Sequence, residues 1–380
     1  MRIIVSATLG GGSAGTWYAI ETARRLAARG HAVVYLSRPG RSALAKAKTA
    51  GLPVIEDVDL EEKSPTRACR NLRRLRSLAR EYAPDVVLAH GGEDHAFWGL
   101  ARVTGARQAA LIRVRALDPK PPKRHPLSRW LHRRTDAIVT VNSRHYAAYQ
   151  SRLRIAPDRL KIIEAGVEPA DYDNLSDAAL SANGVDLPPG KQVVVMVARF
   201  APIKGHRVLL SAAGKIKRRR DDVHHLWVGY PYTYSTETLR RWLVEANLER
   251  DVTIVDQFLP QLPALLAHCQ VGVIASVGSE SLSRSLLEYL ASGLPAVATD
   301  VGGIPDLLAR GDFGRLVPPD NAEALAAAIL DLLAVSERRV ICGQQGRAYV
   351  LGHCRWDLRL DQWEDILTRT VARVRGSTVA

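Results

Sequence analysis

Residues 276–303 read SVGSESLSRSLLEYLASGLPAVATDVGG. The apolar residues Leu286, Leu287 and Leu290 share one helix face, which predicts a helix over 284–292. Short apolar runs on either side predict strands over 271–275 and 295–299. This strand, helix and strand order is typical of a βαβ unit on a parallel sheet.

The same alternation extends through the rest of the chain. Further strands are expected at 2–7, 32–36, 85–89, 109–112, 137–141, 192–198, 224–229 and 252–255. Further helices of the second half are expected at 204–217, 236–246 and 321–334. The polar stretch NGVDLPPG at 183–190 interrupts the pattern and is interpreted as a linker. The sequence therefore predicts two doubly wound α/β domains facing one cleft.

Composition excludes several classes of protein. The chain has 380 residues, of which 47% are hydrophobic and 24% charged, as in ordinary globular proteins. The four cysteines form no CxxC pair, which argues against a zinc site or a disulfide framework. The opening MRIIVSATLGGG predicts a first strand and not a signal peptide, and no apolar stretch is long enough to span a membrane. We expect a soluble, cytoplasmic protein.

The net charge of +14 is unevenly distributed. Residues 1–186 hold 30 Lys and Arg against 19 Asp and Glu, a balance of +11, whereas the remainder holds 23 against 20, a balance of +3. A charge concentrated in one half indicates that this half meets an anionic partner, such as nucleic acid, a phospholipid surface or a phosphorylated acceptor.

Two cations follow the first strand of the second half. The strand VVVMVARF ends near Arg199, and Lys204 with Gly205 opens the next helix. A guanidinium and an ammonium at the carboxyl end of a strand, beside a helix N-terminus, form an anion site suited to a diphosphate. The alternative is that both are solvated surface residues.

Two carboxylates bracket the start of the helix at 284–292. Glu280 is expected in the loop at the end of the preceding strand, and Glu288 within the helix. Two carboxylates at different depths in a binding cleft can accept hydrogen bonds from the hydroxyl groups of two sugars in one ligand. The backbone N–H groups of Ser281, Leu282 and Ser283 can meet a phosphate at the helix N-terminus. Exposed helix glutamates are common, so the pair by itself is a weak signal.

With the following GLPAVATDVGGIPDLL, this segment resembles glycosyltransferase family 4, a group of retaining enzymes with the GT-B fold. The resemblance covers about residues 192–335, through VARFAPIKGH, the two glutamates and GRLVPPDNAEALAAAI. It implies an N-terminal acceptor domain over 1–185 and a C-terminal donor domain over 190–352, both Rossmann-like. The helical stretch 355–380 is expected to pack back on the N-terminal domain.

The resemblance also implies roles for the site residues. Arg199 and Lys204 would hold the diphosphate of a nucleotide-sugar donor and act in catalysis, Glu288 would bind the nucleotide ribose, and Glu280 would bind the transferred sugar. No metal or other cofactor is expected. The Ser283-Arg284 pair differs from the Gly-Phe-Gly of many members and resembles lipopolysaccharide-type transferases.

The N-terminal half offers a glycine-rich turn and a polar loop. In Gly10-Gly11-Gly12-Ser13, the amides of Gly11 and Gly12 are candidates to meet the donor phosphate, although a glycine turn is also an ordinary strand-to-helix connection. His90, Asp94 and His95 crowd the loop after the strand at 85–89, with His95 the candidate catalytic residue. The next strand ends in Arg113-Val114-Arg115, where the family pattern has His-Gly. Those arginines are candidates to meet an anionic acceptor.

Two basic stretches adjoin apolar residues, one running from Arg67 to Arg76 and the other from Lys120 into PLSRWLHRR. Basic residues beside apolar ones are typical of a surface that contacts an anionic membrane, which predicts a location at the inner face of the cytoplasmic membrane. The alternative is that both stretches are solvated faces of ordinary helices, which have the same pattern. The acceptor would then be an anionic or lipid-linked glycan.

Two alternatives to an active transferase remain. One is a catalytically degenerate subunit that binds a sugar nucleotide, which the Arg113 and Arg115 departure suggests. The other is a basic nucleic-acid-binding protein, although the sequence contains no nucleic-acid module and no regular series of stacking aromatics.

Overall fold

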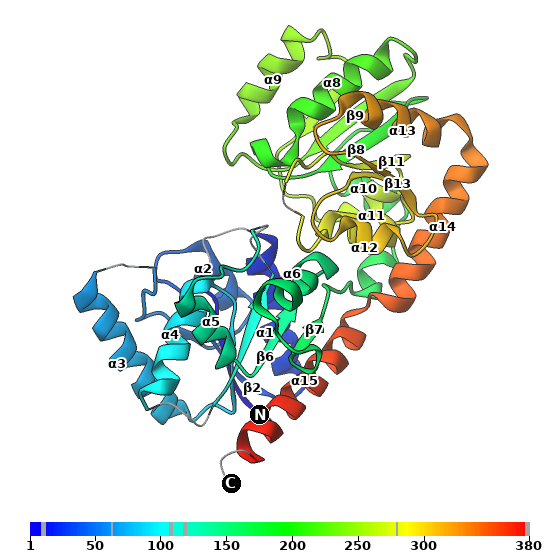
Figure 1. Cartoon of the computed structure of the whole chain (residues 1–380). Coiled ribbons are helices and arrows are strands. Elements are labelled where there is room, and N and C mark those ends of the chain that lie inside the picture. The colour runs from blue at the N-terminus through cyan, green and yellow to red at the C-terminus, as the bar shows by residue number, and fades with distance from the viewer. Residues whose placement is uncertain (9–12, 62–63, 106–108, 117–119, 279, 377–380) are drawn as a thin grey trace. The chain divides into compact units, whose positions relative to one another are not determined.

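The computed structural model describes residues 1–380 except 9–12, 62–63, 106–108, 117–119, 279 and 377–380 (Figure 1). The chain divides into unit 1, formed by Met1–Ala165 and Asp357–Ala380, and unit 2, formed by Gly166–Trp356. Each unit contains a parallel sheet with helices packed on it. The predicted fold class, two doubly wound α/β domains, is confirmed.

Unit 1 contains a seven-stranded sheet in the order β3-β2-β1-β4-β5-β6-β7. Its strands are β1 (Arg2–Ser6), β2 (Ala32–Leu36), β3 (Val54–Ile55), β4 (Val86–Ala89), β5 (Ala110–Arg115), β6 (Ala137–Thr140) and β7 (Leu160–Ile162). Its helices are α1 (Ala14–Ala28), α2 (Ser42–Thr49), α3 (Pro65–Tyr82), α4 (Gly92–Val103), α5 (Pro126–Arg133), α6 (Ser143–Leu153), the 3₁₀ turn Pro157–Arg159 and α15 (Trp356–Gly376). The central strands are buried along their length, as expected for a parallel sheet covered on both faces.

Unit 2 contains a six-stranded sheet in the order β10-β9-β8-β11-β12-β13. Its strands are β8 (Gln192–Val197), β9 (Val223–Val228), β10 (Val252–Val255), β11 (Val271–Ile274), β12 (Ala296–Thr299) and β13 (Gly314–Val317). Its helices are α7 (Asp177–Ser181), α8 (His206–Lys217), α9 (Thr236–Glu245), α10 (Leu262–Ala267), α11 (Arg284–Ala291), α12 (Ile304–Leu308), α13 (Ala322–Ala334) and α14 (Ser336–His353), with 3₁₀ turns at Pro169–Tyr172 and Pro202–Lys204. Apolar residues of α8 and α13 share one core with β8, β9 and β11.

The stretch expected to be a linker belongs to unit 2. Asn183 is 3% exposed, and its side chain donates to the carbonyl of Gln261 at 2.8 Å and accepts from the amide of Gln261 at 3.0 Å. The chain passes between the units earlier, at Ala165–Gly166. The Pro/Gly-rich composition therefore marks an irregular segment of unit 2 and not the boundary between the units. The two hydrogen bonds of the Asn183 side chain attach this segment to the rest of unit 2.

The last helix packs on unit 1. The Arg29 guanidinium, at the end of α1, donates to Asp361 at 2.6 Å and to Glu364 at 2.8 Å. Arg359 pairs with Glu164 at 3.1 Å, and Trp363 is wholly buried. The amphipathic stretch at the C-terminus thus completes the core of the N-terminal unit. Among the described residues, no helix is both long and apolar enough to cross a membrane.

Buried histidines should make the fold sensitive to acid. Burial lowers the pKa of His132, His206 and His225 to about 4. Because the unfolded chain then binds more protons than the native state, stability should be constant above neutral pH and fall as the pH drops from about 6.5 towards 4.

We expect each of these histidines to contribute a loss of about 2 kcal/mol by pH 5. Urea unfolding of the wild type and of His225→Gln at pH 7.5 and pH 5 measures this loss. The variant should lose less stability on acidification than the wild type, and an equal loss in both proteins would contradict the assignment.

Candidate active site

The carboxyl ends of β8 and β11 diverge. The two strands pair only at Val271 with Val194 and at Gly272 with Val195. Beyond this point, the buried Tyr289 hydroxyl of α11 accepts from the Val197 amide at 2.7 Å and contacts the Val273 carbonyl at 3.2 Å. Because β9 continues the sheet on one side and β12 on the other, this is the switch point at which doubly wound sheets bind ligands.

Arg199 lies two residues beyond β8. Its guanidinium stacks on the Tyr232 ring at 4.4 Å, and its Nε atom is buried without a hydrogen-bond partner in the described part of the chain. Arg199 forms no ion pair within the described residues, so its charge remains available to an anion at this strand end.

Lys204 and Glu280 form a direct ion pair, with side chains 19% and 12% exposed. Lys204 ends the 3₁₀ turn after β8, and Glu280 lies in the loop that follows β11. The same Glu280 oxygen accepts from the Ser276 hydroxyl at 2.5 Å, and the Glu280 carbonyl accepts from the Gly303 amide at 2.9 Å. The structure therefore brings together two predicted site residues from adjacent strand ends.

Glu288 is the fifth of the eight residues of α11, and its carboxylate pairs with Arg284 one turn earlier at 2.8 Å. Ser283 caps this helix in the left-handed region, with φ at 44°, and is 5% exposed. The Ser285 hydroxyl donates to the Val197 carbonyl at 3.0 Å, which ties the start of α11 to the end of β8. The helix N-terminus therefore faces the strand end that precedes Arg199.

Four residues that shape this site were not identified from the sequence: Tyr232, Ser276, Arg284 as the partner of Glu288, and Tyr289. Spacing gives a signal for Arg284 alone, because residues four apart on a helix are neighbours. The others come from segments whose proximity depends on the sheet order.

In unit 1, Gly11 and Gly12 lie outside the described residues, and the description resumes at Ser13, whose hydroxyl caps α1 by accepting from the Thr16 amide at 3.2 Å. Asp94 is completely buried and holds the end of β1. It accepts from the Ser6 hydroxyl at 2.7 Å, the Thr8 hydroxyl at 3.0 Å and the Gly91 amide at 2.8 Å. This carboxylate therefore has a structural role.

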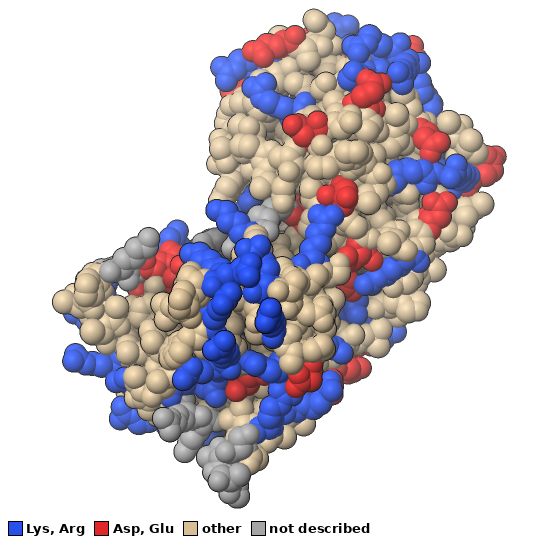
Figure 2. Space-filling model, in the orientation of Figure 1, with Lys and Arg blue, Asp and Glu red and all other residues tan. Residues whose placement is uncertain are grey.

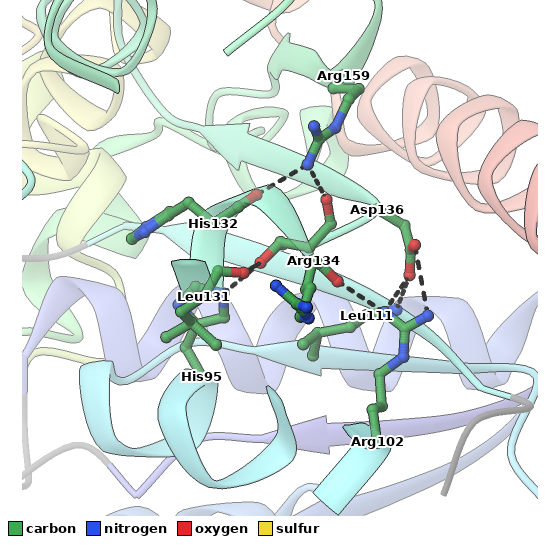
Figure 3. A network of polar contacts seen from close by, with 9 residues as sticks. His95, Arg102, Leu111, Leu131, His132, Arg134, Asp136 and Arg159 are labelled. Carbon is green, nitrogen blue, oxygen red and sulfur yellow. Dashed lines mark hydrogen bonds and ion pairs between the residues drawn. The ribbon is translucent and has the colours of Figure 1, made fainter. Parts of the chain in front are cut away.

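His95 lies inside unit 1 and is 2% exposed. Its Nε2 atom is 2.7 Å from the Thr135 hydroxyl, and its ring meets the His132 ring edge-on at 4.8 Å (Figure 3). Burial lowers its pKa well below the ordinary value, so the imidazole is neutral at pH 7. These contacts join α4 to α5, and the catalytic role of His95 stays a prediction.

His90 follows β4 and is 2% exposed. Neither ring nitrogen has a hydrogen-bond partner among the described residues, and burial lowers its pKa to about 3. Arg113 of β5 is 4% exposed and donates to the carbonyls of Ala89 and Gly91. Arg115 donates to the Lys120 carbonyl at 2.5 Å. These contacts of both arginines are with backbone carbonyls, and contact with an acceptor stays a prediction.

No group of three or more His, Cys, Asp or Glu side chains in the described ranges is placed to hold a metal ion. The charged groups described above at the switch point of unit 2 are three cations, Arg199, Lys204 and Arg284, and two carboxylates, Glu280 and Glu288. Their chemistry suits a ligand that carries both phosphate and hydroxyl groups.

Comparison with known proteins agrees with this fold. The Anabaena protein HepE in complex with UDP superposes with a TM-score of 0.81 at 18% identity, over 97% of this chain and 100% of that one. The lipopolysaccharide outer core galactosyltransferase WaaB superposes with a TM-score of 0.73 at 12% identity, over 97% and 99% of the two chains. The chain is therefore an α/β protein of the GT-B class.

Two family models match consecutive parts of the sequence. The model of Glycosyltransferase Family 4 matches residues 15–171, and that of Glycosyl transferases group 1 matches residues 191–335. The chain belongs to the family 4 glycosyltransferases. D-inositol 3-phosphate glycosyltransferase of Corynebacterium efficiens is 31% identical over 196 residues, which are 50% of this chain and 46% of that protein. The chain thus spans about half the length of such curated relatives.

The Tyr289 hydroxyl should be needed for stability. Tyr289→Phe preserves the ring volume but leaves the part-buried Val197 amide and the buried Val273 carbonyl without this partner. We expect a loss of about 1–3 kcal/mol in the unfolding free energy of unit 2, measured by urea denaturation.

Tyr35→Phe is the matched control. Tyr35 is also completely buried, but its hydroxyl has no hydrogen-bond partner in the described structure. Its removal should be neutral or slightly stabilising. An equal loss of unfolding free energy in both variants would show that the loss in Tyr289→Phe does not come from the hydrogen bonds of the Tyr289 hydroxyl.

Proposed function

We propose that this chain transfers a sugar from a nucleoside diphosphate sugar to an acceptor hydroxyl. The observation that carries the proposal is the position of Arg199, Lys204 and Glu280 at the switch point between β8 and β11. Proteins of similar structure support it, since HepE was solved with UDP and WaaB is a lipopolysaccharide outer core galactosyltransferase.

In this proposal the donor diphosphate binds Arg199, whose charge has no acidic partner in the described structure, and Lys204, which exchanges its contact with Glu280 for a phosphate oxygen. The helix N-terminus after Ser281, Leu282 and Ser283 adds backbone dipoles. Lys204 and Glu280 neutralise each other before the donor binds, which lowers the cost of holding two charges in a partly buried site.

The freed Glu280 carboxylate then accepts hydrogen bonds from the transferred sugar, and Glu288 accepts them from the ribose. Arg284 holds the Glu288 carboxylate in place before the donor arrives. We propose that transfer retains the anomeric configuration, with the leaving phosphate accepting the proton of the acceptor hydroxyl. The two cations would stabilise the charge that develops on that phosphate. This scheme uses neither a metal nor another cofactor.

We propose an anionic or lipid-linked glycan of the lipopolysaccharide or cell-surface type as the acceptor. The excess positive charge of residues 1–186 supports this choice, because such acceptors carry phosphate or acidic sugars. The same positive charge supports a location at the inner face of the cytoplasmic membrane, whose lipids are anionic.

Arg199→Ala and Lys204→Ala should each reduce turnover by about a hundredfold or more in a donor-saturated assay, because each removes charge stabilisation of the leaving group. The donor is first selected by thermal shift from a panel of UDP and GDP sugars. Arg207→Ala is the control, because Arg207 stacks on Trp242 at 4.0 Å and its charge lies outside the proposed site.

Wild-type turnover in either site variant would refute these roles. Donor hydrolysis or transfer by the purified chain alone would exclude the degenerate subunit. The absence of a thermal shift with every nucleotide in the panel would refute the proposed function as a whole.

A further inference from the structure

Residues 120–157 are unusually basic. They contain nine Lys and Arg and one acidic residue, Asp136. A segment with this balance needs anions from elsewhere to neutralise it, either within the fold or from a partner.

The only acid of this segment is already paired within unit 1. The Asp136 carboxylate accepts from Arg102 at 2.6 Å and from the Leu111 amide at 2.7 Å (Figure 3). Arg102 also donates to the Arg134 carbonyl, and Arg159 donates to the His132 carbonyl at 2.8 Å. Buried or part-buried arginines from α4 and from the turn before β7 thus hold the last carbonyls of α5, which fixes this helix on unit 1.

The outer face of α5 keeps its positive charge. Arg129 and Arg133 are four residues apart and therefore share one face of the helix. They and Lys123 and Arg124 just before the helix are exposed, and none of the four forms an ion pair in the described part of the chain. Four cationic side chains therefore point to solvent from one short segment.

An apolar residue lies beside these cations. Leu127 is 64% exposed, at the first turn of α5. Trp130 is half-buried, with the Arg134 guanidinium 4.6 Å above its ring. Figure 2 shows Lys and Arg gathered over the part of unit 1 where α5 lies in Figure 1. We call Lys123, Arg124, Leu127, Arg129 and Arg133 the α5 face.

The other basic helix, α3, is different. Arg74 pairs with Asp57 at 2.6 Å and with Glu81 at 3.1 Å, and Arg76 donates to the Thr104 hydroxyl. Its apolar residues, Leu75 among them, pack into the core and leave its outer face polar. The structure thus distinguishes two helices that are similarly basic in sequence.

We infer that the α5 face is the surface by which this protein docks on an anionic phospholipid bilayer. Its cations meet lipid phosphates, and Leu127 enters the boundary between headgroups and acyl chains. Because α5 is fixed by its inner face, docking requires no unfolding of the helix. A nucleic acid fits less well, since the Arg134 guanidinium occupies one face of the half-buried Trp130 ring and closes that face to base stacking.

The inference deepens the proposed function by naming the surface that would bring the enzyme to a lipid-linked acceptor. Its test needs neither donor nor acceptor. A failure to bind vesicles and a failure to transfer sugar are therefore separate results.

The test is sedimentation of the full chain with vesicles. Wild type should bind vesicles of equal parts phosphatidylcholine and phosphatidylglycerol at physiological salt, and should not bind pure phosphatidylcholine. The triple variant Arg124→Ala, Arg129→Ala and Arg133→Ala should bind about fivefold less for each charge removed, roughly a hundredfold in total. Leu127→Ser should weaken binding severalfold without changing charge.

The matched control is Arg70→Ala, Arg73→Ala and Arg80→Ala on α3, which removes the same charge from an exposed polar face. It should bind vesicles like the wild type, and thermal melting should show all variants folded. The inference is overturned if the wild type ignores anionic vesicles, if the α5 variant binds normally, or if both triple variants lose binding equally. Preferential binding of the wild type to a single-stranded RNA over these vesicles would also overturn it.

Discussion

The divergence of β8 and β11 is the constraint on which the candidate site depends. Parallel strands that part leave amide and carbonyl groups without ladder partners, and burying such groups is costly. Here the Tyr289 hydroxyl bridges Val197 and Val273. The ring fits because Gly272 lies beneath it, where a Cβ atom would come within 2.5 Å of Tyr289. One tyrosine and one glycine thus keep the strand ends apart, and the charged residues occupy the loops that leave them.

Charges around this gap are partly balanced before any ligand binds. Glu280 neutralises Lys204, and Arg284 neutralises Glu288, whereas Arg199 stacks on the Tyr232 ring and pairs with no carboxylate of the described residues. A cation on an aromatic face is held in position without losing its charge to a carboxylate. The site therefore presents one uncompensated positive charge, which is consistent with recognition of an anionic group.

Much of this arrangement could be predicted from the sequence. The strands at 32–36 and 252–255 were predicted with their observed bounds, because each is rich in β-branched or aromatic residues and is bounded by polar residues on both sides. The edge strands β3, β7 and β13 were missed, since β3 and β7 have only two and three residues and β13 begins with a glycine and an arginine, so none of them shows a clear apolar pattern. Likewise, the order of residues placed Lys204 and Glu280 at strand ends. Their ion pair depends on β8 and β11 being neighbours.

The basic N-terminal half shows why composition alone is ambiguous. In the sequence, Arg113 and Arg129 each count as one positive charge. In the structure, Arg113 is buried, and its guanidinium donates to backbone carbonyls at the end of β4, which joins β5 to β4. Arg102 and Arg159 similarly anchor the carboxyl end of α5. Arginines that are paired inside the fold are not available to a partner. The charge that can attract a partner is therefore that of the exposed Lys and Arg side chains without an internal contact. On unit 1 that remainder includes the outer face of α5, where internal arginines hold the helix and external ones are left exposed.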